Sequence, residues 1–261
     1  MLAPVLILLP PSEGKSAPRR GKPLNLDALD FTALSPAREA VLDALVEHCA
    51  TAPEAAAKAL GLGPTQAEHV AANARLREAP AARADRIYTG VLYDALGLGT
   101  LEGAAKGRAT RWLGIMSSAF GVVRPSDPIP AYRLSGDTNL PGIGIVSSYW
   151  RDHLDQVLAP AAGTGLVIDL RSGMYAGFWR PSAAAKVATV RVLHEHNGQR
   201  KVVSHFNKAT KGRIVRALLQ DGSKPANPAR LAEHLTSLGW TVELGVPGKN
   251  GTQLDVVVSE L

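Results

Sequence analysis

Three short apolar runs, each as long as a buried strand, most constrain what this 261-residue chain can fold into. They cover residues 5–9, 112–116 and 166–170, and each is followed by polar residues. Apolar runs of this length, separated by helical patterns, are typical of strands in an α/β sheet. We therefore predict a mixed α/β (α+β) fold in which helices flank a central mixed sheet.

Helical patterns occupy much of the remaining chain. Ser35 is expected to cap a helix that has Pro36 in its first turn and continues to about residue 50. Further helices are predicted over residues 54–60, 65–78, 149–158, 208–220 and 228–238. Extended segments are predicted over residues 86–91, 186–193, 201–206, 241–244 and 254–259, with a hairpin turn at Asn197 and Gly198. Because no internal repeat or long linker interrupts these elements, we predict one domain over residues 1–261, carrying a helical insertion near residues 36–80.

The charge balance bears on the kind of partner. Lys and Arg number 29 against 23 Asp and Glu, so the formal net charge is +6, which attracts polyanions. Cys49 is the one cysteine, which excludes an intramolecular disulfide and favours a cytoplasmic location. No apolar stretch approaches the roughly 18 residues that a membrane span requires, so no membrane partner is predicted. The oligomeric state stays open.

A proline-rich segment after the second apolar run concentrates charged and hydroxyl side chains. Arg124, Asp127, Tyr132 and Arg133 fall within ten residues of one another, and the prolines between them favour a stiff loop. Since a guanidinium binds phosphate or carboxylate through two parallel hydrogen bonds, two arginines near one aspartate predict an anion site. A surface loop with a structural ion pair is the alternative.

The same segment resembles a known family. S-S-A-F-G-V-V-R-P-S-D-P-I-P-A-Y-R-L over residues 117–134 is similar to the central signature of the YaaA family of bacterial peroxide-stress proteins. Other matching segments follow in order: L-P-P-S-E-G-K at 9–15, Y-T-G at 88–90, W-R-D-H-L at 150–154, I-D-L-R-S-G-M-Y at 168–175 and F-N-K-A-T-K-G-R at 206–213. Phe120, residues 135–136, Arg171 and Gly173 depart from the family pattern, which affects the expected substrate preference. The resemblance implies a DNA-binding protein that protects against peroxide stress.

Two further features favour DNA as the partner. Gly61-Leu62-Gly63 joins two predicted helices, as in a helix-hairpin-helix element, where glycines let backbone amides approach a DNA phosphate. Such an element has also been proposed for the YaaA family. Lys208, Lys211 and Arg213 lie at the start of a predicted helix, where cations oppose the helix dipole unless an anion is bound. A plain helix turn and a solvated helix face are the respective alternatives.

Polar residues that follow the three strands can form one site. Ser12 and Lys15 follow the first strand, Ser117 and Arg124 belong to the second, and Asp169 belongs to the third together with Ser172 and Tyr175. If the strands are parallel neighbours, these residues converge at one edge of the sheet and build a basic cleft with one carboxylate inside it. An Asp169 carboxylate that only neutralises Arg171 or Lys15 is the alternative.

Two functions remain open, and with them the question of whether the chain is an enzyme. The first is a cytosolic DNA-binding protein of the YaaA type, whose basic residues neutralise phosphates in the cleft. The second is an enzyme acting on a nucleotide or modified base, for example by cleaving an N-glycosidic bond. In it Asp169 would be the general base or stabilise a developing cation, Lys15 and Arg124 would hold phosphate, and Tyr88 or Tyr175 would stack on the base.

The predicted site residues follow from these two functions. No metal or cofactor is predicted, because His194 and His196 lack a third ligand at a diagnostic spacing. The residues predicted to contact nucleic acid or phosphate are Ser12, Lys15, Thr89, Arg124, Tyr132, Arg133, Ser172, Lys208, Lys211, Arg213, Gly61 and Gly63. The catalytic residues predicted for the second function are Asp169, Lys15, Tyr88 and Tyr175.

Overall fold

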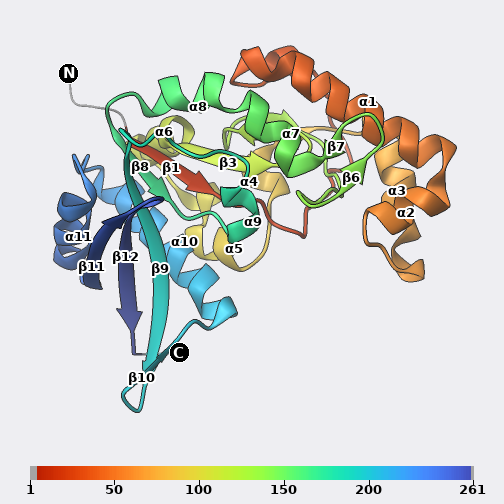
Figure 1. The fold of residues 1–261 in the computed structure, drawn as a ribbon. Helices are drawn as coiled ribbons and strands as arrows, with labels where there is room; N and C mark the ends of the chain where they lie inside the picture. Colours follow the sequence, from red (N-terminus) through yellow and green to blue (C-terminus); the bar gives the residue numbers. More distant parts are fainter. Residues whose placement is uncertain (1–4, 260–261) are drawn as a thin grey trace.

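The computed structural model describes residues 5–259 and shows a central sheet with helices on both faces (Figure 1). The sheet has the strand order β11-β12-β9-β8-β1-β3-β4, with β10 paired to β9. Its strands are β1 (Val5–Leu9), β3 (Leu113–Ser117), β4 (Gly121–Val123), β8 (Leu166–Asp169), β9 (Lys186–His196), β10 (Gln199–Lys201), β11 (Thr241–Gly248) and β12 (Gly251–Val258). Two short ladders lie outside it, β2 (Ala82–Arg83) with β5 (Pro128–Ile129) and β6 (Asn139–Leu140) with β7 (Gly144–Ile145). The predicted mixed α/β fold is confirmed.

The first strand, β1, lies between β8 and β3 and is parallel to both. Ile7 is in register with Leu113 of β3 and with Ile168 of β8. All five residues of β1 are buried, as expected for a parallel strand that is covered on both faces. The carboxyl ends of β1, β3 and β8 therefore lie together, and we call this part of the molecule the strand-end edge.

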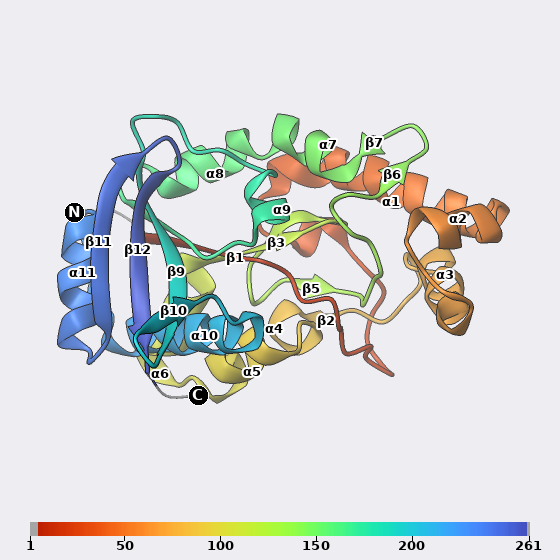
Figure 2. The same ribbon diagram turned by 60° about the horizontal axis from the view of Figure 1, so that its bottom comes forward.

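The helices form two layers around the sheet. One face is covered by α1 (Ser35–Thr51), α7 (Val146–His153) and α8 (Asp155–Ala162), and the other by α5 (Val91–Leu96), α6 (Gly103–Trp112) and α10 (Ser204–Asp221) (Figures 1 and 2). The remaining helices are α2 (Pro53–Ala59), α3 (Ala67–Ala74), α4 (Ala84–Ile87), α9 (Gly173–Ala176) and α11 (Pro228–Ser237). Together α1, α2 and α3 form the predicted helical segment at one end of the molecule (Figure 2). Within residues 5–259, no helix combines the length and apolar character needed to cross a bilayer.

The predicted extended segment over residues 86–91 is partly wrong. Its first residues belong to the helical turn α4, and α5 begins at Val91. The amides of Ala84 and Asp85 donate to the carbonyls of Asp127 and Pro125, so contacts with a loop distant in sequence fix this turn. Within this segment the backbone is extended at Tyr88, where it pairs with the loop after β1.

The predicted strand over residues 201–206 and the predicted helix over residues 149–158 also need correction. The strand prediction is wrong from Ser204 onward, where α10 begins. Phe206 packs from within that helix against the ring of His194, with ring centroids 4.9 Å apart, so tertiary packing extends the helix backward. The second prediction covers two helices, because the chain changes direction at Leu154 between α7 and α8.

Candidate functional site

The loop after β1 is joined to the segment around residue 88 at the strand-end edge. Lys15 and Tyr88 form an isolated antiparallel bridge, and the amide of Ser16 donates to the carbonyl of Ile87 over 2.8 Å. The Thr89 amide donates to the Ser12 hydroxyl over 3.1 Å. The structure thus brings together Ser12, Lys15, Tyr88 and Thr89, four of the predicted site residues from two distant segments.

Two buried tyrosines connect this loop to the end of β3. The hydroxyl groups of Tyr88 and Tyr132 are 3.1 Å apart, and the Tyr132 hydroxyl lies 2.8 Å from Oγ of Ser117. Burial raises the pKa of both tyrosines above the ordinary value. Both hydroxyls therefore stay protonated at neutral pH and can donate hydrogen bonds.

The Lys15 amine lies against these tyrosines. Its Nζ donates to the Ser12 carbonyl over 2.8 Å and lies 4.3 Å from the centroid of the Tyr132 ring and 5.7 Å from that of Tyr88. The pKa of Lys15 is lowered from 10.5 to about 7, mainly by burial and then by the positive charge of Arg133, against the opposing effect of Glu13. At neutral pH a large fraction of the Lys15 amine is consequently uncharged.

A second hydroxyl pair lies beside the first. The hydroxyl of Tyr175 is 3.3 Å from Oγ of Ser118, and the indole N–H of Trp150 donates to the Ser118 carbonyl over 2.7 Å. Burial raises the pKa of Tyr175, while Arg133 opposes the rise. Arg133 therefore acts electrostatically on both Lys15 and Tyr175, which places it among the residues of the strand-end edge.

Asp169 ends β8, as predicted, but it has a structural partner. Nε and Nη2 of Arg171 donate to its two carboxylate oxygens over 2.9 and 2.7 Å, and the Arg171 amide donates to Oδ1 over 3.0 Å. A carboxylate held in this way has both of its oxygens occupied by hydrogen-bond donors. The pairing argues against the general-base role predicted for Asp169, which stays a prediction, and favours the alternative of a carboxylate that neutralises Arg171, whose Nη1 donates to the Tyr175 carbonyl.

Arg124 lies at the opposite end of the sheet. The strand β4 runs antiparallel to β3, pairing Val123 with Ile115, and so carries the next residue back toward the start of β3. There Nη1 of Arg124 donates to the Leu113 carbonyl over 2.7 Å, and its guanidinium stacks on the Phe31 ring. The prediction that Arg124 joins the anion site is not supported by its position, because this guanidinium is used for packing.

The predicted basic residues of α10 divide into two groups. Lys208 and Arg213 are exposed, whereas burial lowers the pKa of Lys211, whose Nζ donates to the Leu170 carbonyl next to β8. Since α10 begins at Ser204, none of the three lies in the first turn, where the dipole of the helix acts most strongly. The predicted helix start at residue 208 is therefore wrong, and the dipole of α10 gives no reason to expect a bound anion. Lys211 nevertheless reaches the strand-end edge.

The Gly61–Gly63 turn lies at the outer end of the helical segment. It joins α2 to a short 3-10 turn before α3, and Gly61 has φ +64°. A Cβ built on either glycine meets no atom within 4 Å, so the turn is open to a ligand. At the other end of α3, the Asn73 side chain bonds both the amide and the carbonyl of Arg133, which ties this segment to the strand-end edge.

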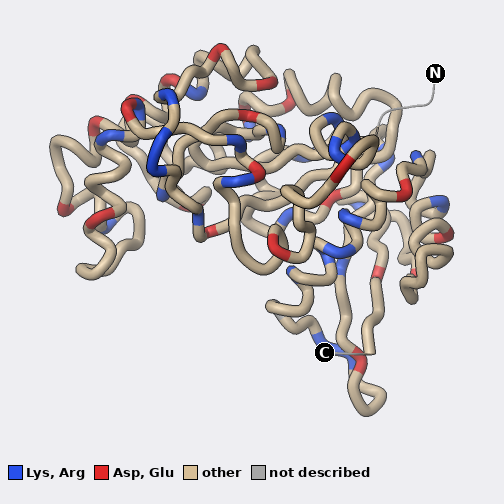
Figure 3. The backbone as a smooth tube through the Cα atoms, turned by 180° about the vertical axis from the view of Figure 1, so that it is seen from behind, with Lys and Arg blue, Asp and Glu red and all other residues tan. Residues whose placement is uncertain are grey.

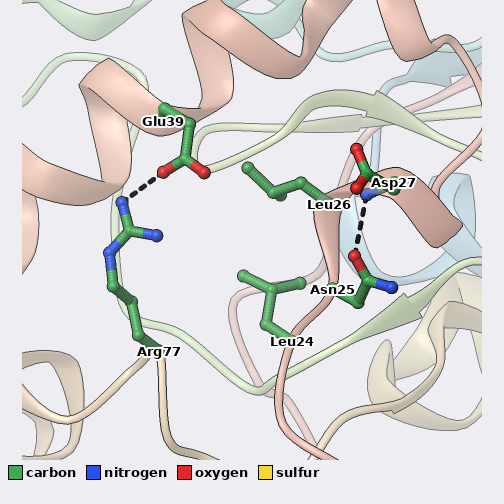
Figure 4. A pocket seen from close by; sticks show the side chains of 6 residues that line it. All are labelled: Leu24, Asn25, Leu26, Asp27, Glu39 and Arg77. Atoms are coloured by element: carbon green, nitrogen blue, oxygen red, sulfur yellow. Dashed lines mark hydrogen bonds and ion pairs between the residues drawn. The ribbon is translucent and has the colours of Figure 1, made fainter.

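Neither the distribution of charge nor the pocket between residues 24–27 and Arg77 points to a second ligand site. Lys and Arg are interspersed with Asp and Glu along the backbone (Figure 3). A pocket of about 200 Å³ lies between residues 24–27 and the side chains of Glu39 and Arg77 (Figure 4). The Arg77 guanidinium in it is paired with Glu39 and Asp43, so it has little charge to offer an anion. Among residues 5–259, no cluster of His, Cys, Asp and Glu could hold a metal ion.

Several members of the site were not predicted. Ser117 was named only as a residue at a strand end, and Ser118 and Tyr93 were missed, although the Tyr93 hydroxyl donates to the Pro10 carbonyl over 2.6 Å. Serines and tyrosines are common in every part of a protein, and only the two consecutive serines at the end of an apolar run could have drawn attention. Ser172 is exposed beside α9, and no hydrogen bond of its side chain to residues 5–259 was found.

The fold and this site define a mixed α/β protein with a hydroxyl-rich site at the carboxyl ends of adjacent parallel strands. The family model described as Peroxide stress protein YaaA matches residues 5–243. A UPF0246 protein of Streptomyces coelicolor is 52% identical over 261 residues, which cover 98% of this chain and 100% of the relative. UPF0246 proteins of Corynebacterium efficiens and Corynebacterium glutamicum are 40% and 37% identical, each over 92% of this chain and 95% of the relative. The chain therefore belongs to the peroxide stress protein YaaA family.

Proposed function

We propose that this protein binds DNA in the cytoplasm, as part of the response to peroxide, through the strand-end edge and the helical segment beside it. The proposal rests on the unpaired side chain of Arg133. Its guanidinium has no hydrogen-bonded or ion-paired partner among residues 5–259, and it acts electrostatically on Lys15. Arg133 and the partly charged Lys15 lie together here, with Glu13 opposing them and Asp137 also acting on this edge through Tyr175, and the unpaired guanidinium of Arg133 can bind a phosphate.

The helical segment adds a second contact at a suitable distance. Its α3 is bonded to the Arg133 backbone through Asn73, and the open Gly61–Gly63 turn precedes that helix. At a rise of 1.5 Å per helical residue and about 2 Å in a 3-10 turn, the two points are roughly 15 Å apart. This separation corresponds to about four to five base-pair steps along duplex DNA, so one duplex could contact both.

The exposed side chains of α10 complete the proposed surface. Lys208 and Arg213 form no ion pair with the described residues, so their charge is available to phosphate. Such contacts release counterions from DNA and give sequence-independent affinity that falls steeply with salt. Arg133 would then position the backbone, while Lys208 and Arg213 add affinity.

An enzyme that acts on a nucleotide or a modified base remains the second candidate. The linked hydroxyls of Ser117, Tyr132 and Tyr88 favour it, because an electrostatic clamp for phosphate has no need of buried hydroxyl donors. The acid–base chemistry would then belong to Lys15 and the tyrosines rather than to Asp169, which is paired with Arg171.

The test is the affinity for a fluorescent duplex, measured by anisotropy over a series of salt concentrations. Arg133→Gln, Lys208→Gln and Arg213→Gln should each weaken binding and each lower the slope of log affinity against log salt by about 1. Lys106→Gln removes an exposed lysine on α6 and should leave both quantities unchanged. Absence of binding at low salt, or an equal effect of Arg133→Gln and Lys106→Gln, would refute the proposal. Breakdown of added nucleotides, followed by chromatography, would instead support the enzyme.

A further inference from the structure

We propose that Lys15 is a nucleophile that forms an imine with the aldehyde of a phosphate-bearing sugar. Such an aldehyde occurs in the open-chain form of an abasic site in DNA and in free sugar phosphates, and both present the same chemistry to the protein. The inference rests on the proposed function in one respect, because Arg133 would hold the phosphate. It goes beyond that function in assigning a covalent step to the site.

The geometry gives the Lys15 amine a defined position at the strand-end edge. Nζ is held by the Ser12 carbonyl at 2.8 Å and lies over the Tyr132 ring, so the long side chain is ordered before a ligand arrives. On its outer side the amine approaches the carbonyl of Glu13, an exposed residue. The tyrosine rings and the Glu13 carbonyl all lie close to Nζ, and the proposal requires that a ligand approach the amine past the exposed Glu13.

The surroundings also favour the uncharged amine, which is the nucleophilic form. The charged and titratable groups that face Lys15 are Glu13, Arg133, Tyr88 and Tyr132, and only Glu13 carries negative charge. With a pKa of about 7, Lys15 has roughly a thousandfold more free amine at pH 7 than a solvated lysine has. Lysines that act as nucleophiles in other proteins are activated by the same combination of burial and a neighbouring cation.

The covalent step balances without any redox partner. The lone pair of Nζ attacks the carbonyl carbon, the C–O π bond opens, and one of the two amine hydrogens passes as a proton from nitrogen to oxygen, which gives a carbinolamine. This intermediate loses the oxygen as water while nitrogen gives up its second hydrogen, and a C=N bond forms. One amine and one aldehyde thus yield one imine and one water. Because the pKa values of Tyr88 and Tyr132 are raised, their hydroxyls stay protonated and can donate to the carbonyl oxygen.

The imine can be tested by reductive trapping of the full chain with cyanoborohydride, which converts it to a stable secondary amine. One probe is a duplex with a single abasic site, and the other is glyceraldehyde 3-phosphate. Peptide mass spectrometry then locates the adduct. Lys15→Arg keeps the positive charge but cannot form an imine, and Lys106→Arg makes the same chemical change at an exposed lysine on α6. Circular dichroism checks that both variants fold.

We expect a dominant adduct on Lys15 in the wild-type chain, whose yield rises as the pH passes through about 7. The yield should fall by at least about tenfold in Lys15→Arg and stay unchanged in Lys106→Arg. Faster trapping of the abasic duplex would identify DNA as the source of the aldehyde, and faster trapping of the free sugar phosphate would identify a small molecule.

Adducts spread over surface lysines, with no preference for Lys15 in the wild-type map, would overturn the inference even if the variant did not fold. The result is separable from the proposed function. DNA binding without trapping at Lys15 would remove the imine and leave the DNA proposal standing. Trapping of the sugar phosphate by a chain that does not bind DNA would remove the DNA proposal and leave the imine standing.

Discussion

The contact between α5 and α10 makes a sharp prediction about Gly212. The backbone of α10 lies directly on α5 at this glycine. A Cβ at Gly212 would overlap the carbonyl oxygen of Leu92 and lie 3.0 Å from Cβ of Ala95. Because the first of these atoms belongs to backbone, it cannot rotate away. We therefore expect Gly212→Ala to push the two helices apart.

The size of the effect follows from two opposing contributions. Replacing glycine by alanine inside a helix favours folding by about 1 kcal/mol. Forcing an extra methyl group into a packed interface costs about 1 to 3 kcal/mol, and the upper part of this range applies where backbone must move. The clash should win, so Gly212→Ala should lower the free energy of unfolding by about 1 to 2 kcal/mol. The shift of α10 should also weaken the bond from Lys211 to the Leu170 carbonyl.

Urea unfolding, followed by far-ultraviolet circular dichroism, measures this change. Gly107→Ala in α6 is the matched control, because a Cβ there meets only the mobile end of the Arg111 side chain, at 3.2 Å. The control should gain up to about 1 kcal/mol from its helix propensity alone. If Gly212→Ala is as stable as the wild type or more stable, the packing argument for α5 and α10 is refuted.

Three further predictions concern buried polar groups. Lys15→Met should raise the free energy of unfolding by about 1 to 4 kcal/mol at pH 7 and by less as the pH approaches 10.5. The folded-state pKa of about 7 lies below 10.5, so between these pH values the unfolded wild-type chain binds more protons than the folded one. A gain of the same size in urea titrations at pH 7 and at pH 10 would contradict the assigned pKa. Arg38 is fully buried and donates to the carbonyls of Asp30 and Val122. Arg38→Met should therefore lower the free energy of unfolding, measured in the same way, by about 3 kcal/mol. A change within error of zero would show that these carbonyls find other donors. The thiol of Cys49 is buried, and burial raises its pKa, so it should react with a disulfide reagent only after unfolding; rapid reaction of the native protein would contradict this burial.

The layout of the sheet could be predicted because its signal is local. Each of β1, β3 and β8 is an uninterrupted apolar run, and such runs mark strands that are buried on both faces. Once these strands are parallel neighbours, the loops at their carboxyl ends must meet, which is why Ser12, Lys15 and Ser117 could be placed together from the sequence. The resemblance to the YaaA family, confirmed over residues 5–243, pointed to the same segments.

The position of Arg124 could not be predicted, because it depends on a strand of three residues. The short β4 reverses the chain after Phe120 and carries Arg124 away from the strand-end edge. The prolines that follow indicated a stiff loop but not its direction. Only the glycine at position 121, which has φ +72° in the structure, indicated a tight turn.

The sequence could not decide the role of Asp169 either, because the spacing between Asp169 and Arg171 is compatible with two different roles. An aspartate two residues before an arginine can lie free at the end of a strand or form the paired arrangement that it has with Arg171. Side-chain direction at a strand end decides between them, and that direction depends on the packing of Tyr175 and the loop around it. The lowered pKa of Lys15 likewise depends on burial that only the assembled fold provides.

Hydrogen–deuterium exchange of the full chain, with and without a saturating DNA duplex, tests the central claim most directly. DNA bound at the strand-end edge and the helical segment should slow exchange in peptides that cover residues 12–16, 58–66, 130–135 and 206–214. These peptides come from four distant parts of the sequence, which the fold places along the proposed DNA surface. Unchanged exchange in all four, or slowing confined to β11 and β12, would contradict the account.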